Sequence, residues 1–245
     1  MNIKILIEYD GTGYHGWQRQ KNALSIQEVL EDAISSITRE TIKIIGAGRT
    51  DAKVHAIGQV ANFRSNTKIP IEKLPYAINS RLPNDIAVKD AKIVPEDFHA
   101  QFSAKSKIYI YRIYNAPFPS PLLRNYTYFF PLALNISAIL KALPFFIGTH
   151  DFAAFMASGS DVKSTVRKIE RLEIHKRQNM DLLEFKIQAN GFLYNMVRII
   201  VGTLVEVGLG KIEPEEIKSI IKSKRRENAG RTLPPQGLCL REVIY

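Results

Sequence analysis

The sequence predicts an α+β fold of two similar halves, each with a mainly antiparallel sheet and with helices on its outer face. Two observations support this prediction. The hydrophobic periodicity of residues 3–94 indicates strand, helix, strand, strand, helix, strand, and residues 107–244 follow a similar order. The chain of 245 residues is also long enough for two small domains, each with its own core.

The first half begins with a strand at residues 3–9, where five of the seven residues are apolar or aromatic. Ser25 and Glu28 have the spacing of a capping box, which predicts that a helix begins there. Apolar residues then recur every three or four positions up to Ile37, as on the buried face of a helix. The remaining elements of this half are expected in the order strand, strand, helix and strand, at residues 41–47, 57–63, 71–80 and 86–94.

The second half contains a strand at residues 181–189, where apolar and polar side chains alternate. Its other expected elements are a strand at 107–115, a helix at 136–147, a strand at 166–175, a long helix at 193–207, a charged helix at 214–225 and a strand at 238–244.

The two halves meet at residues 100–106. We therefore predict an N-terminal domain of residues 1–104 and a basic C-terminal domain of residues 105–245. The order of elements is that of ferredoxin-like and RRM domains, and we expect the catalytic cleft between the two domains.

The composition favours a cytoplasmic protein. A single cysteine, Cys239, excludes an internal disulfide, whereas secreted proteins of this size often contain several. Residues 1–5 do not have the pattern of a secretory signal peptide. The longest apolar stretch, residues 199–207, is interrupted by Gly202, Thr203 and Glu206, so no membrane span is expected.

The charge is strongly positive and unevenly distributed. The formal net charge is +10, of which residues 105–245 contribute +9 and residues 1–104 only +1. Such a basic excess favours a polyanionic partner, because phosphates bound by Lys and Arg release their counterions. The alternative is a basic protein whose lysines and arginines are simply solvated.

Residues 11–16 match the dinucleotide-binding pattern G-x-G-x-x-G after a strand, but no helix opens at these glycines and no acidic residue ends the next strand. We therefore reject a dinucleotide site. The aromatic and basic residues of this loop suit RNA better, since aromatic rings stack on bases and Arg binds phosphate. These residues are Tyr14, His15, Trp17 and Arg19. A plain connecting loop is the competing interpretation.

Residues 48–56 form a second glycine-containing loop, with Asp51 as the candidate catalytic residue. An aspartate after a threonine in a turn more often only caps the backbone. Arg49, however, places a cation two residues away. The helix expected at 193–207 is apolar almost all round except for Arg198, which needs an anionic partner if it is buried. Asp51 is a good candidate for that partner, and Glu206 is the alternative.

Tyr109 and Tyr111 form a further site element, since strand alternation places both on one face of the strand. Tyrosine offers a stacking plane with a hydroxyl, which suits a base flipped out of its helix. Two tyrosines on one strand face can equally belong to a core.

At these residues the sequence resembles the tRNA pseudouridine synthase A family, over essentially the whole chain. The matching pieces of the first half include Glu8-Tyr9-Asp10-Gly11, Gly16-Trp17-Gln18-Arg19-Gln20, Ala47-Gly48-Arg49-Thr50-Asp51-Ala52, Val54-His55-Ala56 and Phe98-His99-Ala100. Those of the second half include Tyr109-Ile110-Tyr111-Arg112, His150-Asp151-Phe152, Met196-Val197-Arg198 and Pro234-Pro235-Gln236-Gly237-Leu238.

The resemblance implies roles for four residues. Asp51 matches the catalytic aspartate, and Tyr109 matches the tyrosine that contacts the target base. Arg49 matches the residue that displaces the base from the stack, and Arg198 the arginine that pairs with the catalytic carboxylate.

The resemblance also implies the reaction. Members of the family are isomerases that convert uridines 38, 39 and 40 of the tRNA anticodon stem-loop to pseudouridine. They act as homodimers and use no metal or organic cofactor. One departure is Lys53, where the family usually has glycine. If the backbone there requires a positive φ, lysine costs on the order of 1 kcal/mol; the lysine could instead bind phosphate.

The expected partners are tRNA and a second copy of the chain, with no metal and no membrane. Candidate RNA contacts are Arg19, Lys53, His55, Lys222, Lys224 and Arg225. The basic run at 222–226 could equally be a solvated helix end.

Two other functions compete with this one. One is a non-catalytic RNA-binding module of similar fold, in which Asp51 would be dispensable. The other is a metal-dependent RNA hydrolase, which the five scattered histidines do not favour.

Overall fold

The structure is a computed structural model, which describes residues 1–159, 162–177 and 180–245. The chain divides into two units. Unit 1 consists of Met1–Lys105 and Cys239–Tyr245, and unit 2 of Ser106–Leu238. The predicted assignment of residues 105–245 to one domain is therefore wrong for residues 239–245, which return to unit 1 because they pair there with another strand.

The sheet of unit 1 has the strand order β4-β1-β3-β10. Strand β1 (Asn2–Tyr9) is antiparallel to both β3 (His55–Arg64) and β4 (Ile86–Val94). The short β2 (Ile45–Gly46) pairs with β3, and β10 (Leu238–Ile244) runs parallel to it. The pairing with β10 is made at His55 and Ala56, directly after the loop that contains Asp51.

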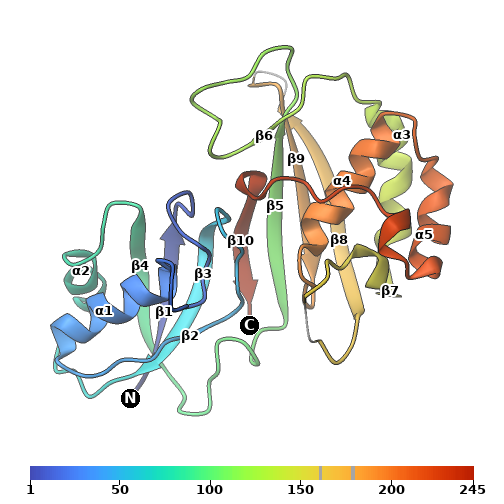
Figure 1. Cartoon of the computed structure of the whole chain (residues 1–245). Coiled ribbons are helices and arrows are strands. Elements are labelled where there is room, and N and C mark those ends of the chain that lie inside the picture. Colours follow the sequence, from blue (N-terminus) through green and yellow to red (C-terminus); the bar gives the residue numbers. More distant parts are fainter. Residues whose placement is uncertain (160–161, 178–179) are drawn as a thin grey trace. The chain divides into compact units, whose positions relative to one another are not determined.

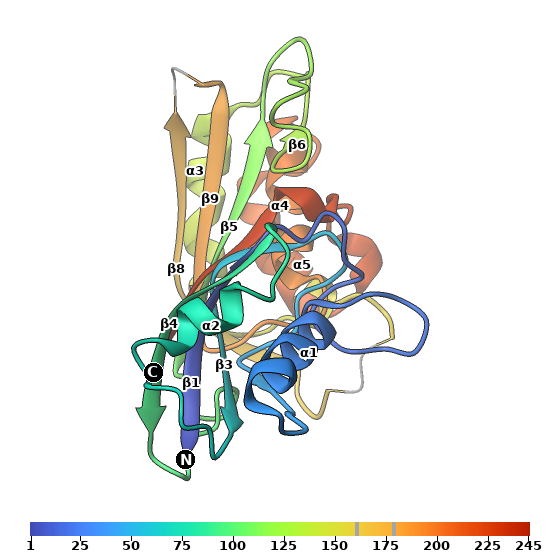
Figure 2. The same cartoon turned by 90° about the vertical axis from the view of Figure 1, so that its left-hand side faces the viewer.

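Two helices, α1 (Ile26–Thr38) and α2 (Leu74–Asn79), lie on the same side of this sheet (Figure 2). Alternate residues of β1 are buried beneath the helices, while Leu6 on the other face is exposed. Helix α1 begins as predicted, since the Ser25 side chain accepts a hydrogen bond from the Glu28 N–H.

The sheet of unit 2 has the strand order β5-β9-β8-β7 (Figure 1). All of these neighbours are antiparallel, and the short β6 runs parallel to β5. The bounds are Ser106–Tyr114 for β5, Tyr128–Phe129 for β6, Gly148–Asp151 for β7, Val166–Arg177 for β8 and Leu182–Ala189 for β9.

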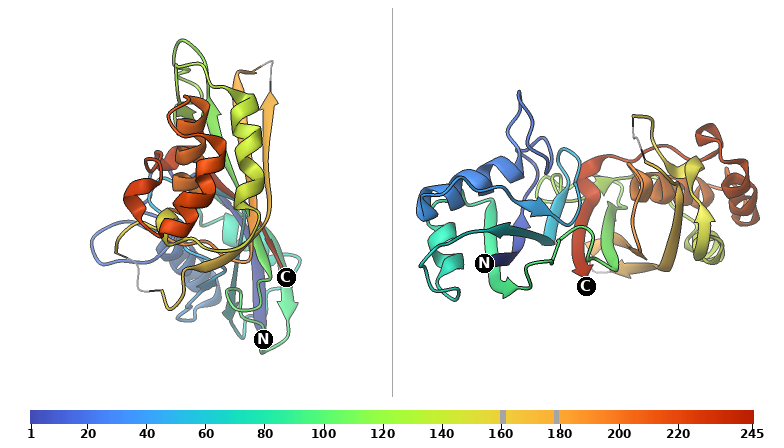
Figure 3. Two further views of the ribbon diagram at one scale, coloured as in Figure 1. Left: turned by 90° about the vertical axis from the view of Figure 1, so that its right-hand side faces the viewer. Right: turned by 90° about the horizontal axis from the view of Figure 1, so that it is seen from below.

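The helices of unit 2 gather on one face of its sheet (Figure 3). The α-helices are α3 (Ile136–Ala142), α4 (Met196–Gly208) and α5 (Ile217–Ser223). Short 3-10 helices lie at Leu143–Phe146, Ala153–Phe155, Pro214–Glu216, Arg226–Asn228 and Pro235–Gly237. Helix α4 is the most buried, with Arg198 and Glu206 as its partly exposed residues.

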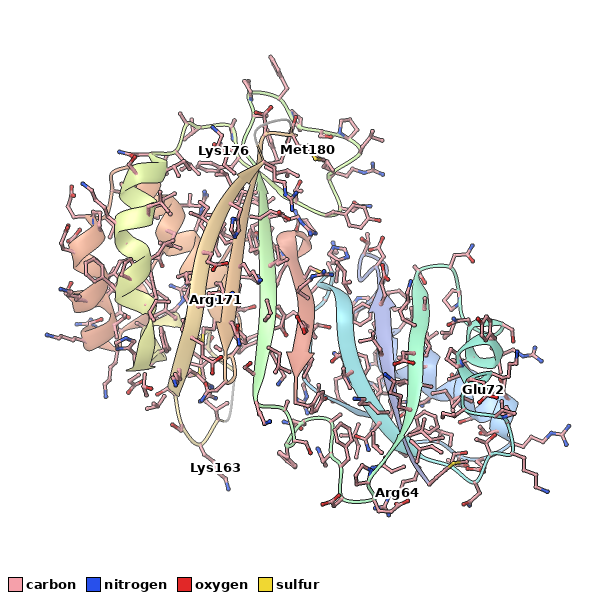
Figure 4. The ribbon with its side chains drawn as sticks, turned by 180° about the vertical axis from the view of Figure 1, so that it is seen from behind. Arg64, Glu72, Lys163, Arg171, Lys176 and Met180 are labelled. Carbon is pink, nitrogen blue, oxygen red and sulfur yellow. The ribbon has the colours of Figure 1, made fainter. Side chains whose placement is uncertain are left out.

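The opposite face of this sheet carries charged side chains, among them Arg171 (Figure 4). Arg112 and Arg177 each donate a hydrogen bond of 2.8 Å from Nε to the Glu184 carboxylate between them. Partial burial opposes the ionised form, yet the two guanidinium groups hold the pKa of Glu184 below its usual range. Charged side chains on neighbouring strands thus pair with one another on this face of the sheet.

The predicted α+β class with mainly antiparallel sheets is confirmed. None of the described helices is both long and apolar enough to cross a membrane.

Candidate active site

Asp51 lies on the loop between β2 and β3, at the start of a tight turn. The Val54 N–H donates a hydrogen bond of 3.1 Å to the Asp51 carbonyl, which closes a four-residue turn. Lys53 stands in its third position with φ +65°, where a type II turn requires a positive φ. The backbone at Lys53 thus has the positive φ that favours glycine. The expected energetic cost of a lysine at this position therefore applies.

Two hydrogen bonds anchor Gly48 and Thr50, the residues on either side of Arg49. The Gln59 side-chain amide donates to the Gly48 carbonyl at 2.9 Å. The Thr50 hydroxyl shares a hydrogen bond of 2.8 Å with the buried Tyr9 hydroxyl. Burial raises the pKa of Tyr9, so its hydroxyl is neutral at physiological pH.

The anchoring of residues 48 and 50 leaves Arg49 exposed and Asp51 half-buried. In addition, the Trp17 N–H donates to the Thr50 carbonyl at 3.0 Å. The loop thus carries the Asp51 carboxylate and the Arg49 guanidinium two residues apart. Its backbone is held at Gly48 and at Thr50.

The glycines at 11 and 16 pack against this same loop. A Cβ on Gly11 would lie 2.1 Å from the Val54 carbonyl oxygen, and one on Gly16 would lie 2.5 Å from that of Thr50. The Lys53 N–H also donates to the Tyr14 carbonyl at 3.2 Å. Gly11 and Gly16 therefore allow the two loops to pack closely. No helix begins at these glycines, since α1 begins at Ile26.

Tyr14 and Trp17 are core residues, so the prediction that their rings stack on RNA is wrong. Their exposed fractions are only 5% and 2%. The Trp17 indole lies against Gly46, where a Cβ would be 2.5 Å from Nε1. The Tyr14 hydroxyl donates to Asp85 at 2.7 Å. For these two rings the plain connecting loop was the correct interpretation.

His55 is buried directly after the turn. Its Nδ1 lies 3.1 Å from both the Gly11 nitrogen and the Asp10 carboxylate. These contacts tie β3 to the glycine-containing loop. A direct RNA contact by His55 stays a prediction, although its ring has little exposed surface.

Several basic candidates already have acidic partners within the chain. Arg19 lies 3.0 Å from Glu31 and 3.4 Å from Glu28, and its hydrogen bond to Glu31 raises its pKa. Lys224 lies 2.8 Å from Asp151, and Arg225 lies 2.7 Å from Glu227. Lys53 and Lys222 are exposed. All remain predicted RNA contacts.

Tyr109 lies on β5, on the helix-facing side of the unit 2 sheet. It is 7% exposed and meets Phe192 edge to face, with ring centroids 5.0 Å apart. Tyr111 shares this face but is fully buried, and its hydroxyl donates to the Pro234 carbonyl at 2.7 Å. The core interpretation therefore applies to Tyr111, whereas Tyr109 lies beside a second, partly exposed aromatic ring.

Arg198 lies in the first turn of α4 and is half-buried. Its Nε donates to the Leu233 carbonyl at 2.7 Å, and its Nη1 donates to the Asn195 side chain at 2.5 Å. Glu206, the alternative partner, lies 3.0 Å from Lys211 and 3.7 Å from Arg231. These two hydrogen bonds fix the direction of the guanidinium, and its pairing with Asp51 stays a prediction.

The support of the Asp51 loop by Tyr9, Thr50 and Gln59 was not predicted. One available signal was Gln59 itself, a polar residue between Gly58 and Val60 in a largely apolar strand. A carboxylate on an anchored loop, two residues from a guanidinium, suits nucleophilic or general-base chemistry. Within the described ranges, no cluster of three or more His, Cys, Asp or Glu side chains is arranged to hold a metal ion.

Comparison with known proteins gives concordant results. A family model described as tRNA pseudouridine synthase matches residues 5–103 and 142–245. A protein of Thermoanaerobacter sp. named tRNA pseudouridine synthase A is 57% identical over 244 residues, which cover 100% of this chain and 99% of that protein. Proteins of the same name from Acetivibrio thermocellus and Clostridium kluyveri are 52% and 48% identical with the same coverage.

Among solved structures, a chain in the crystal structure of a Cbf5-Nop10-Gar1 complex is similar over 97% of this chain and 57% of its own length. The TM-score is 0.40 and the sequence identity 12%.

Proposed function

The chain belongs to the tRNA pseudouridine synthase family and isomerises uridine to pseudouridine in tRNA, and we propose that its targets are uridines 38, 39 and 40 of the anticodon stem-loop. The reaction breaks the bond between ribose C1′ and uracil N1, and joins C1′ to C5 after the base has turned. The proton lost from C5 is balanced by one gained at N1. Nothing is oxidised and no group leaves the molecule, so the reaction requires no cofactor.

Asp51 is the proposed catalytic residue, either as a nucleophile at C1′ or as a base that removes a ribose proton. The observation that supports this role is the anchoring of Gly48 and Thr50 by Gln59 and Tyr9. Thr50 directly precedes Asp51, so these anchors hold the stretch of backbone that carries the carboxylate. Preorganisation of this kind lowers an activation barrier without any new contact.

Three further residues act around this carboxylate in the proposal. Arg49, which is exposed, displaces the target base from the stack. Tyr109 contacts the displaced base, supported by its position beside Phe192. Arg198 pairs with Asp51 and keeps it ionised, supported by the fixed direction of its guanidinium.

Binding of tRNA uses basic side chains, including Lys53 and Lys222, which are exposed. We also propose that the protein acts in the cytoplasm as a homodimer. Light scattering tests the dimer, and a monomer that retains full activity would contradict it.

The test of the proposed function uses unmodified tRNA without added metal or nucleotide. Pseudouridine is then mapped chemically along the whole molecule, for the unmodified protein, for Asp51→Asn and for Asp97→Asn. Asp97 is an exposed aspartate elsewhere in unit 1 and serves as the matched control. We expect product at positions 38–40 with the unmodified protein and with Asp97→Asn, and none with Asp51→Asn.

Full activity of Asp51→Asn would refute the catalytic role of the aspartate. Product at other positions would refute the anticodon stem-loop as the target. If all three proteins bound tRNA but none formed product, the RNA-binding module would be the correct interpretation.

A further inference from the structure

Two cationic side chains, Lys107 and Arg167, lie near each other at one end of the unit 2 sheet. Lys107 on β5 is paired with Ala189 on β9, which is paired with Ile169 on β8. Arg167 precedes Ile169 by two residues, so it lies on the same face of the sheet as Lys107. The face is the one covered by helices, since Ala189 and Ile169 are fully buried there.

The two cations are partly buried and close enough to affect each other. Burial lowers the pKa of Lys107, and the nearby Arg167 guanidinium lowers it further. Burial also lowers the pKa of Arg167. Arg167 donates from Nη1 to the carbonyls of Ser164 and Val166, which leaves other N–H groups of its guanidinium for a ligand.

Within the described part of the chain, neither Lys107 nor Arg167 has a carboxylate within ion-pair distance. Partly buried like charges of this kind destabilise a protein unless an anion joins them.

Lys107 and Arg167 lie next to Tyr109, whose ring is proposed to contact the target base. Tyr109 follows Lys107 by two residues, so their Cα atoms are about 7 Å apart on the same face. The segment at 191–192 contacts both ends of this site. A Cβ on Gly191 would lie 3.4 Å from Arg167 Nε, and the Phe192 ring meets Tyr109 edge to face.

We propose that Lys107 and Arg167 bind a backbone phosphate of the tRNA beside the nucleotide whose base meets Tyr109, an inference that rests on the proposed role of Tyr109. The phosphate supplies an anion for both cations, with the guanidinium as a forked donor and the ammonium as a point charge. A phosphate held here fixes the backbone of the displaced nucleotide, and such contacts compensate the cost of unstacking its base.

The test measures tRNA binding as a function of salt in the Asp51→Asn background, where no turnover is expected. Lys107→Gln and Arg167→Gln are compared with Lys168→Gln, which removes a neighbouring exposed charge from the other face of β8. For each of the first two variants, we expect a several-fold loss of affinity and a salt slope smaller in magnitude by about 0.7 to 0.9, as for one lost phosphate contact. Lys107→Arg and Arg167→Lys keep the charge and should retain the slope.

Three results would overturn this proposal. The first is an affinity and slope equal to those of Lys168→Gln. The second is a loss of affinity with an unchanged slope. The third is a loss that the charge-retaining variants share, since that indicates a packing role. Turnover in Asp51→Asn would instead refute the catalytic proposal, and the binding comparison would still be valid because it is made at equilibrium.

Discussion

At the scale of single residues, Lys53 is the strained position of the Asp51 loop. Its φ of +65° is a conformation that lysine adopts at a cost of about 1 kcal/mol and glycine adopts freely. We therefore expect Lys53→Gly to raise the free energy of unfolding by about 1 kcal/mol, measured by urea denaturation.

Lys53→Ala is the control for this effect, because it removes the charge but keeps the Cβ. If alanine stabilised the protein as much as glycine, charge and not backbone strain would be the cause. A loss of tRNA affinity shared by both variants would support the phosphate contact proposed for Lys53.

Tyr9 gives a second prediction at this scale. Tyr9→Phe removes the partner of the Thr50 hydroxyl, so the loop loses one of its two anchors beneath Arg49. Tyr245→Phe is matched, since the Tyr245 hydroxyl donates to the Ala100 carbonyl at 2.8 Å, also within unit 1. Each variant should destabilise the protein by about 1–3 kcal/mol. Only Tyr9→Phe should lower kcat, with KM for tRNA unchanged, and an equal effect of both on kcat would contradict a positioning role.

The residues differ in how far sequence alone could place them. Asp51 and Arg49 belong to a short contiguous motif, so their proximity needs no tertiary structure. Trp17 has the residue type of an RNA-stacking ring, but Gly46 provides the space that buries it. That space depends on a contact between two loops, which the local pattern does not contain.

At the scale of elements, the glycine-containing loop acts as a support for the Asp51 turn. Gly11→Ala would place a Cβ against the Val54 carbonyl, within the turn itself. We expect a marked fall in kcat, because this backbone contact must open. Gly13→Ala is the matched control, since nothing lies within 4 Å of its added Cβ and no positive φ is involved. Equal activities of the two variants, measured on unmodified tRNA, would contradict this account.

The predicted elements were most accurate where local signals agree. Helix α1 spans Ile26–Thr38, because its N-cap and its apolar periodicity both mark the same segment. The strand expected at 41–47 is reduced to Ile45–Gly46, since side chains of α1 bind its backbone instead. Glu31 accepts from the Ile44 N–H, and Gln27 donates to the Ile44 carbonyl. The helix expected at 136–147 ends as a 3-10 turn that contains Pro144, whose ring has no N–H to donate.

At the scale of the whole molecule, strand β10 makes unit 1 dependent on residues that follow unit 2. Leu240 is fully buried on this strand, and Arg241 next to it is exposed. Leu240→Ala should destabilise unit 1 by about 2–5 kcal/mol, and Arg241→Ala by less than about 0.5 kcal/mol. Hydrogen exchange of the β3 amides measures this. Faster exchange confined to unit 2 would contradict the assignment of β10 to unit 1.

The location of β10 could not be predicted from periodicity. Residues 238–244 have the pattern of a strand wherever they pair, and the pattern does not specify the partner. The close approach of β10 to Gly58, where a Cβ would lie 2.3 Å from the Arg241 carbonyl, is the tertiary contact that does.

The return of β10 to unit 1 also has a consequence for biosynthesis. The ribosome makes Asp51 early, but the strand that pairs with His55 and Ala56 emerges only after all of unit 2. At about 5–20 residues per second, the delay between β3 and β10 is roughly 10 to 35 seconds. During that interval a nascent chain has the aspartate without its complete sheet. We therefore expect translation intermediates to be inactive on the tRNAs that surround the ribosome.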